Sequence, residues 1–326
     1  MMAVTGATGH IGNVLVRKLL ERGDRVRALV PPFDDTTPLC GLEVEQVEGD
    51  VLDLDTLRRA FDGCDTVFHL AGVISIASGK SDLLNRVNVH GTRNVVEACL
   101  GVGIKRLVYT SSIHAIVEPP CGTVIDETCG FNPDVMRWDY DRSKARATLE
   151  VLKASARGLD AVVVCPTGVT GPYDSRVSEV GQLIVDYARR KMKAYMDGAY
   201  DFVDVRDVAA GHILAAEKGR PGETYILSGE RITVSGLMSL LEEVTGMPRP
   251  RLKLPNWVTD LGGALAPVYS FVTRRRPLVT TYSLRVLRGN SVVSSAKARR
   301  ELGYTSRPLR ESIEDAFRWL RDNHKL

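Results

Sequence analysis

Three side chains in the middle of the chain could together move a proton on and off an alcohol or a ketone. Tyr140 and Lys144 lie four residues apart in the stretch YDRSK, and Ser112 ends the earlier stretch VYTSS. Residues with this spacing share one face of a helix, so the phenol and the ammonium are expected to project into one cleft. An ammonium favours a phenolate and lowers the pKa of a tyrosine from its usual value near ~10. The pair therefore predicts general acid–base chemistry, with a surface tyrosine beside a surface lysine as the alternative.

A glycine-rich stretch at the start of the chain could bind a pyrophosphate. VTGATGHIG places Gly6, Gly9 and Gly12 between an apolar strand and a helical pattern. Glycines permit a tight turn and a close approach of the backbone to phosphate, and the free N–H groups of the helix N-terminus face the anion. The position between a strand and a helix is the context that such a loop requires, whereas an isolated glycine pattern would be a weak signal.

The elements that must position these residues alternate along the first half of the chain. Short β-rich runs are VRALV, VEQVE, TVFHLAG, RLVYTSS and AVVVCP, with helical patterns at 13–22, 53–62, 82–102 and 141–157. This alternation predicts an α/β fold in which helices cover both faces of a doubly wound parallel sheet. Further helices are expected at about 179–191 and 234–245, and both TYILSG and the helix after FVDVRDVA are expected to return to the sheet.

Several ordered motifs resemble the extended short-chain dehydrogenase/reductases, the NAD-dependent epimerase/dehydratase family. They are TGATGHIG, GDVLD, FHLAG, NVHGTRNVVEA, VYTSS, YDRSK, CPTGVTGP and FVDVRDVA, and they span nearly the whole chain. The resemblance implies a Rossmann sheet with a smaller, partly interleaved C-terminal substrate lobe. We place the dinucleotide-binding domain at 1–165, with a return segment at about 202–228, and the lobe at 166–326.

The resemblance also implies roles for individual residues. Ser112, Tyr140, Lys144 and Asn88 are the expected catalytic residues, and no metal site is expected. Asp50 corresponds to the acid that meets the adenine amino group, and Lys144 to the lysine that also binds the nicotinamide ribose. The expected cofactor-binding residues are Gly6, Thr8, Gly9, His10, Ile11, Gly12, Asp50, Val51, Leu70, Ala71, Gly72, Tyr140, Lys144, Pro166, Thr167, Gly168 and Val169.

Four of the polar residues near these motifs have a second interpretation. The family pattern favours Ser112 over Ser111 as the hydroxyl that holds the substrate oxygen, because the catalytic serine ends its run. Asn88 could hold Lys144 through a water, or it could be a core or capping amide. His69 lies in an apolar strand and is interpreted as a core histidine, whereas His114 follows the serines and could line a substrate pocket.

The end of the second strand usually decides between NAD and NADP, since an acid there binds the ribose diol and an arginine accepts the 2′-phosphate. This position is Val30, followed by two prolines, so neither determinant is present. Asp34 and Asp35 come next, and no basic residue follows before Arg58. The charge pattern favours NAD over NADP.

Two classes of substrate compete, and a non-enzymatic role is a third possibility. Reductases and dehydrogenases similar to dihydroflavonol reductase and 3β-hydroxysteroid dehydrogenase act on apolar carbonyl compounds, whereas epimerases and dehydratases act on nucleotide sugars. The latter usually carry an arginine where this chain has Tyr200. The C-terminal part contains Met192, Tyr195, Met196, Trp257, Tyr269 and Phe271. Such residues are more often core than pocket, but those that line the cleft would suit an apolar carbonyl compound better than a nucleotide sugar. We therefore expect an oxidoreductase for a small, largely apolar substrate. The retained Ser112, Tyr140 and Lys144 argue against a dinucleotide-binding sensor.

Composition limits the partners and the location. The chain has 326 residues with 44% hydrophobic and 25% charged residues, and its formal net charge is only +3, so we expect neither nucleic acid nor a membrane as a partner. The one dense basic run is Arg274 to Arg276, and the most apolar stretch contains Asp260 and Pro267. Six cysteines without metal spacing and the lack of a signal-peptide pattern favour the cytoplasm. By analogy with the family, we expect a homodimer formed by the helices that carry Asn88 and Tyr140.

Overall fold

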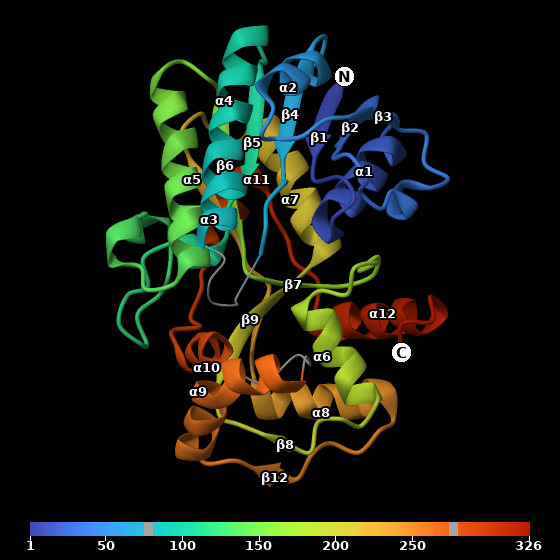
Figure 1. The fold of residues 1–326 in the computed structure, drawn as a ribbon, viewed down its shortest axis with the longest axis vertical. Helices are drawn as coiled ribbons and strands as arrows, with labels where there is room; N and C mark the ends of the chain where they lie inside the picture. The colour runs from blue at the N-terminus through green and yellow to red at the C-terminus, as the bar shows by residue number, and fades with distance from the viewer. Residues whose placement is uncertain (75–80, 274–279) are drawn as a thin grey trace.

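A parallel sheet forms the centre of the larger half of the protein (Figure 1), in a computed structural model that describes residues 1–74, 81–273 and 280–326. Its seven strands follow the order β10-β6-β5-β4-β1-β2-β3, and every neighbouring pair is parallel. The chain order therefore reverses between β1 and β4, as expected for a doubly wound Rossmann sheet. The strands are β1 (Met2–Thr5), β2 (Val26–Val30), β3 (Glu45–Glu48), β4 (Thr66–His69), β5 (Arg106–Thr110), β6 (Ala161–Pro166) and β10 (Thr224–Leu227).

Helices bury apolar side chains against both faces of this sheet. One face is covered by α1 (His10–Glu21), α7 (Val205–Lys218) and α11 (Ala296–Leu302), and the other by α2 (Leu54–Phe61), α4 (Gly91–Val102) and α5 (Asp139–Ala156). The strands β5 and β6 are apolar along almost their whole length, as expected for strands that are buried on both sides. The predicted α/β fold class is confirmed.

A second, smaller group of elements lies beyond the carboxyl ends of the strands, in the lower half of Figure 1. It contains a three-stranded sheet of β7 (Gly168–Thr170), β9 (Ala199–Asp204) and β11 (Glu230–Thr233), and a pair of β8 (Ala194–Tyr195) and β12 (Leu252–Lys253). The helices of this lobe are α6 (Glu179–Ala188), α8 (Val234–Thr245), α9 (Asn256–Thr273), α10 (Thr281–Arg288) and α12 (Leu309–Asp322). Its core joins α6, α8 and α12, with Ile184, Leu241 and Ile313 fully buried.

The chain crosses between the two halves more often than the sequence patterns indicated. The strand β9 belongs to the small sheet, whereas α7 and β10 join the large one, so the predicted return segment begins after β9. A later segment also returns, because α11 packs against α7 and β10. The division of the chain at residue 165 stays a prediction.

The helical pattern at 82–102 is interrupted in the structure. The short α3 (Ser81–Leu84) leads into a π-helical turn over Asn85–His90 before α4 begins. Such turns often occur at functional sites, and this one carries Asn88. Short 3₁₀ helices occupy Thr37–Leu39, Ile113–Ala115, Glu127–Cys129 and Pro133–Val135.

Two features noted in the sequence, the dense basic run and the most apolar stretch, lie at or near α9. Arg274 to Arg276, and the side chains of Tyr269 and Phe271, lie outside what the structure describes. The most apolar stretch of the sequence forms α9. Within the described ranges, the helices all fall short of the length and hydropathy of a membrane span.

Candidate active site

The loop between β1 and α1 is held in shape by two of its three glycines. Gly6 has a φ of +71°, and a Cβ there would lie 2.6 Å from the Ala71 nitrogen. A Cβ on Gly12 would lie 2.1 Å from the Gly6 oxygen, which no side chain tolerates. Gly9 differs, because its Cβ would meet only that same oxygen, at 3.2 Å. The fold itself therefore requires Gly6 and Gly12, whereas Gly9 faces space that a ligand could occupy.

This loop is suited to hold the pyrophosphate of a dinucleotide. Gly9 is the N-cap of α1 and provides no side chain to satisfy the first N–H groups of the helix. The first turn, His10 to Asn13, contains no acidic residue that would repel an anion. The imidazole of His10 is held by the Pro172 carbonyl at 2.9 Å, which brings the loop after β7 over the start of α1. The N-terminus of α1 thus has free donors and the favourable end of the helix dipole.

A distant arginine reaches the same loop. Arg176, which follows β7, donates to Oδ1 of Asp34 at 2.6 Å and to the Thr8 hydroxyl at 2.9 Å. The Thr8 hydroxyl donates in turn to Oδ2 of Asp34 at 2.6 Å. The charge pattern that favours NAD did not include Arg176, which lies 142 residues from Asp34 and pairs with it, so the choice between NAD and NADP stays a prediction.

The other predicted cofactor residues line the carboxyl ends of the strands. Asp50 accepts a hydrogen bond from the Leu52 N–H at 2.9 Å, and Val51 fills the space above Gly91. Leu70, Ala71 and Gly72 follow β4, where the Ala71 N–H donates to the Thr5 hydroxyl at 3.1 Å. The run from Pro166 to Val169 joins β6 to β7.

The two serines after β5 have different surroundings. The Ser111 hydroxyl shares a hydrogen bond with the Thr148 hydroxyl at 2.7 Å in the core of the sheet. The Ser112 hydroxyl accepts from the His114 N–H at 3.2 Å, and it lies near enough to the Tyr140 phenol to lower the pKa of that phenol. The structure therefore places the Ser112 hydroxyl near Tyr140, whereas the Ser111 hydroxyl is bonded to Thr148.

In this structure, burial opposes the effect that Lys144 is expected to have on the pKa of Tyr140. Burial raises the pKa of Tyr140 to about 12, although the hydrogen bond from Ser112 acts in the opposite direction. Lys144 is buried as well, and burial lowers its pKa to about 8. Its Nζ donates to the Thr110 carbonyl at 2.7 Å and to the Tyr109 hydroxyl at 3.0 Å. Because its protons go to these groups, the lysine does not offset the burial of the Tyr140 phenol.

Asn88 contacts neither Lys144 nor Tyr140 through its side chain. Its Oδ1 accepts from the Val73 N–H at 2.8 Å, and its Nδ2 donates to the Val73 carbonyl and the Ser143 hydroxyl, both at 3.0 Å. The side chain therefore ties the loop after β4 to α5, between Tyr140 and Lys144. This geometry favours a positioning role, and a water-mediated contact with the lysine stays a prediction.

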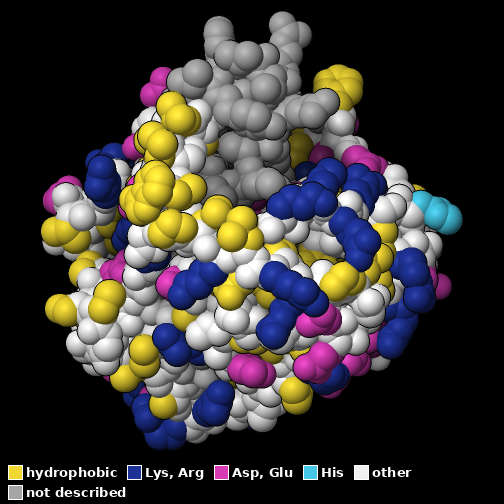
Figure 2. Space-filling model, turned by 90° about the horizontal axis from the view of Figure 1, so that it is seen from below, with side chains coloured by type: hydrophobic (Ala, Val, Ile, Leu, Met, Phe, Trp, Pro, Cys, Tyr) yellow, Lys and Arg dark blue, Asp and Glu magenta, His cyan; other side chains and the backbone are white. Residues whose placement is uncertain are grey.

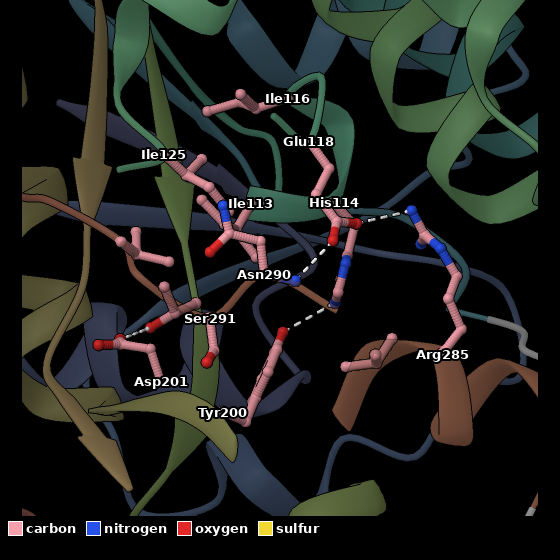
Figure 3. A pocket seen from close by; sticks show the side chains of 13 residues that line it. Ile113, His114, Ile116, Glu118, Ile125, Tyr200, Asp201, Arg285, Asn290 and Ser291 are labelled. Atoms are coloured by element: carbon pink, nitrogen blue, oxygen red, sulfur yellow. Dashed lines mark hydrogen bonds and ion pairs between the residues drawn. The ribbon is translucent and has the colours of Figure 1, made fainter. Parts of the chain in front are cut away.

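A pocket lies beside the turn that follows Ser112, because Ile113 and His114 line it (Figure 3). One part of its wall is apolar, and another part carries hydroxyl, amide and charged groups from the lobe. The apolar residues are Ile113, Ile116, Ile125, Val286 and Val293, and the polar ones are His114, Glu118, Thr167, Tyr200, Asp201, Arg285, Asn290 and Ser291. His114 therefore lines this pocket, whereas His69 is a fully buried core residue between the hydroxyls of Thr5 and Thr92.

An aromatic pair closes one side of the pocket. Nε2 of His114 and the hydroxyl of Tyr200 are 2.8 Å apart, and the two rings are nearly parallel. Burial lowers the pKa of His114 to about 4 and raises that of Tyr200, so both are neutral at pH 7. Gly168 leaves room for this ring, since a Cβ there would lie 2.6 Å from Cε1 of Tyr200. A neutral aromatic group thus occupies the position of the nucleotide-sugar arginine.

A buried carboxylate connects the helix of Tyr140 to the lobe. Asp141 accepts from the Tyr282 hydroxyl at 2.8 Å and from Arg285 at 3.1 Å, both on α10. Burial raises the pKa of Asp141 to about 6 despite these hydrogen bonds. Arg285 also donates to Glu118 at 2.9 Å. Sequence reasoning missed Arg285, Glu118 and Asp201, because no local pattern places these distant residues in one pocket.

The site shows no arrangement that would hold a metal. In the ranges that the structure describes, no three His, Cys, Asp or Glu side chains cluster in a way that could bind an ion.

Residues 2–228 match the family model described as the NAD dependent epimerase/dehydratase family. The chain belongs to this family. Its fold and the order of its motifs are explained by that membership, and it is an NAD(P)-dependent enzyme of the oxidoreductase and epimerase/dehydratase class.

Several curated relatives match almost the whole chain. Sterol demethylase protein B of Methylococcus capsulatus is 40% identical over 98% of both chains. An Arabidopsis thaliana 3beta-hydroxysteroid-dehydrogenase/decarboxylase is 31% identical over 98% of this chain and 80% of its own length. The predicted likeness to dihydroflavonol reductase and 3β-hydroxysteroid dehydrogenase members of the family is confirmed.

Solved structures show the same architecture. The crystal structure of gox2253 has a TM-score of 0.88 at 35% identity and covers 100% of this chain and 99% of its own. DesIV, a dTDP-glucose 4,6-dehydratase of Streptomyces venezuelae solved with NAD and TYD bound, has a TM-score of 0.82 at 22% identity, with 99% and 98% coverage. The second likeness supports the fold alone.

Proposed function

We propose that the protein is a reductase or dehydrogenase that interconverts a ketone and a secondary alcohol on a small, largely apolar substrate. The observation that carries the proposal is the approach of the Ser112 hydroxyl to the Tyr140 phenol, beside a pocket whose wall includes Ile113 and His114, which follow Ser112 directly. Binding pockets for small molecules are usually apolar, with a few polar groups that fix orientation. The names of the relatives, which include reductases and a hydroxysteroid dehydrogenase, support the same substrate class.

Each side chain has a defined task in this proposal. The Ser112 hydroxyl holds the substrate oxygen, and the Tyr140 phenol donates a proton to that oxygen or accepts one from it. Lys144 stays charged below pH about 8, and its ammonium lies behind the phenol on the same helix face. The residues from Gly6 to Gly12 would hold the dinucleotide, which when bound supplies or accepts a hydride.

The direct test of substrate class is a comparison of two panels. Apolar ketones and aldehydes would be offered with reduced cofactor, and oxidation of the cofactor would be followed at 340 nm, the usual wavelength for NADH. UDP- and dTDP-hexoses would be offered in parallel with NAD, and their products would be separated by chromatography. We expect turnover in the first panel only. Turnover of a nucleotide sugar without turnover of any ketone would contradict the proposal.

Cofactor choice is proposed as NAD(H) binding at least as well as NADP(H). Support comes from Asp35, which is exposed and close to Asp34, and from the absence of a basic residue between Val30 and Arg58 in the sequence. Arg176 is the opposing charge, since it could leave Asp34 to meet a 2′-phosphate. Titration of both cofactors against wild type and Arg176→Ala separates these effects. A wild-type preference for NADP(H) that the variant loses would reverse the proposal and assign the phosphate to Arg176.

One observation keeps an epimerase or dehydratase as a second candidate. An open, polar pocket in the lobe contains Arg231 and Arg288, two cations that could meet a diphosphate. Among the described residues, Arg231 is held only by the Ser291 hydroxyl, at 2.8 Å, whereas Arg288 pairs with Asp260. Arg231→Gln should leave ketone turnover unchanged under the first candidate, and it should raise the KM for a nucleotide sugar under the second.

The assembly and the cellular location are also proposals. A homodimer through α4 and α5, which carry the exposed pairs Arg93–Glu150 and Arg157–Glu97 across their surface, follows the family analogy. A cytoplasmic location suits the six free cysteines, three of which are buried thiols. Sedimentation equilibrium of the purified protein would give the mass of the assembly, and a monomer at every concentration would exclude the dimer.

A further inference from the structure

The free end of the lobe combines exposed apolar and basic side chains on one face. Figure 2 views the molecule from this end and shows Lys and Arg side chains gathered beside hydrophobic ones. The apolar row consists of Leu252, Trp257, Leu261 and Leu265, which are 59%, 70%, 55% and 52% exposed. The last three are spaced by four residues along α9 and therefore share one side of that helix.

The apolar row is too concentrated to be ordinary surface. Isolated exposed leucines are common on soluble proteins. Here, however, four of the nine large hydrophobic side chains that are exposed in the described ranges fall between residues 252 and 265. The row also contains a tryptophan, the residue most typical of a boundary between water and lipid.

The positive charge of the chain is concentrated at the same end. Segments 189–197 and 247–260 contain seven basic and two acidic residues, whereas the whole chain has a net charge of only +3. The pairing of β8 with β12 sets Ala194 beside Leu252, so the two segments run next to each other. Three of these cations, here called the basic row, make no side-chain hydrogen bond or ion pair with any described residue; they are Arg190, Lys193 and Arg251, whereas Arg189 donates to the Lys325 carbonyl.

We propose that this face, made of the basic row and the apolar row, docks on the surface of an anionic phospholipid bilayer. Leucines and a tryptophan on one side of a helix can enter the boundary between headgroups and acyl chains, while Lys and Arg beside them meet the lipid phosphates. The small net charge of the whole chain led us to expect no membrane partner. That sum does not reveal the local excess of positive charge on this face. The contact is peripheral and involves no span.

Docking through this face would bring the pocket close to the lipid surface. The helix α9 packs against α10, and α10 provides Arg285 to the pocket wall. If the substrate is apolar, as proposed above, a lipid-bound lobe would bring its pocket close to the phase in which that substrate dissolves. The docking itself does not depend on the reaction, and it can be measured without substrate or cofactor.

Vesicle sedimentation with the full chain tests the proposal. Vesicles of phosphatidylcholine alone would be compared with vesicles that contain about 30% phosphatidylserine, at about 0.1 M salt. We expect binding to the anionic vesicles only, weakening as salt rises. Because a basic residue near such a surface contributes about fivefold in affinity, Lys193→Gln with Arg251→Gln should weaken binding about 25-fold.

A matched control separates local from global charge. Arg25 and Arg59 are also exposed and have no acidic partner in the described ranges, but they lie on the sheet domain near β2 and α2. Arg25→Gln with Arg59→Gln removes the same net charge and should leave binding within about twofold of wild type, if the local face is what binds. Equal losses in both double variants would overturn the proposal in favour of non-specific attraction.

The exposed tryptophan offers an independent signal. The emission of Trp257 should shift to shorter wavelength when anionic vesicles are added, and the shift should vanish in Trp257→Phe, because the other two tryptophans are more buried. If the wild-type protein does not bind anionic vesicles, the proposal is overturned. It is also overturned if the wild-type protein is a dimer and Leu261→Ser is a monomer, since a second copy of the chain would then cover this face.

Discussion

At the scale of single residues, we expect the protonation state of Tyr140 to set the direction in which the site works best. Burial raises the pKa of its phenol to about 12, so the group is a proton donor throughout the neutral range. A donor favours reduction of a carbonyl, whereas oxidation of an alcohol requires the phenolate.

This leads to a prediction for the pH profile. The kcat for ketone reduction should stay flat between about pH 6 and 8, and the kcat for alcohol oxidation should rise with pH over the same interval, by up to about tenfold per unit. Stopped-flow measurement of both directions in one buffer series checks this. A reductive kcat that falls through a pKa near neutrality would show that the phenol ionises far more easily than its burial indicates.

The residue scale also shows what sequence can and cannot supply. The glycine loop and the pair of Tyr140 and Lys144 were predictable, because each depends on spacing within one loop or one helix. The partners of Lys144, Thr110 and Tyr109, were not, since they lie on a strand whose distance from α5 is set by the packed sheet.

At the scale of elements, two glycines of the loop before α1 have different roles. The fold requires Gly12, whereas we expect dinucleotide binding to require Gly9. Gly9→Val should abolish dinucleotide binding and leave the melting temperature nearly unchanged, because its Cβ meets only the Gly6 oxygen at 3.2 Å. Gly12→Val should unfold or strongly destabilise the protein, because its Cβ would meet that oxygen at 2.1 Å. Calorimetry and cofactor titration distinguish the two. Unchanged cofactor affinity in Gly9→Val would remove the loop from the binding site.

The contact between α5 and α10 provides a second prediction at this scale. Burial raises the folded-state pKa of Asp141 to about 6, above its ordinary value of 3.8. A carboxyl group shifted upward stabilises the fold below its unfolded pKa, and this contribution is lost as pH rises through the folded pKa. The stability of Asp141→Asn relative to wild type should therefore increase between about pH 4 and 7.

Urea unfolding of both proteins across that interval measures the difference, in which contributions from all other groups cancel. Asp134→Asn, which changes an exposed aspartate, is the control and should give a flat difference. A difference that decreases with pH would mean that Arg285 and Tyr282 stabilise the ionised form of Asp141 more than burial opposes it.

At the scale of the whole molecule, the two halves are joined by crossings that sequence patterns did not reveal. The predicted sheet and its helices were confirmed, because alternating apolar periodicity is a local signal. The return of α11 to the sheet and the contact of Arg176 with the loop between β1 and α1 depend on segments far apart in the chain. Conversely, the lobe helices α6 and α8 were visible from their apolar spacing, but their packing with α12 was not.

The contact of Arg176 with Asp34 and Thr8 should control release of the dinucleotide. Exposed ion pairs contribute about 0–1 kcal/mol to stability, so Arg176→Ala should hardly change the melting temperature. The substitution should nevertheless accelerate cofactor dissociation several-fold, because the loop after β7 is then no longer bonded to the loop between β1 and α1. Stopped-flow displacement measures the rate, with Arg157→Ala as a control that removes a similar exposed pair with Glu97. An unchanged rate would mean that this contact does not hold the cofactor.

The central claim is that Tyr140 is the acid and base of a carbonyl–alcohol interconversion, and Tyr140→Phe tests it most directly. The variant keeps the ring and removes only the hydroxyl group, whose pKa the nearby Ser112 lowers. Steady-state kinetics on the best ketone should show a kcat lower by roughly 10²- to 10⁴-fold, with cofactor affinity within about twofold of wild type. Tyr187→Phe, which loses a hydroxyl bonded to the Met247 carbonyl in the lobe, should retain full activity. Near-normal turnover by Tyr140→Phe would contradict the account.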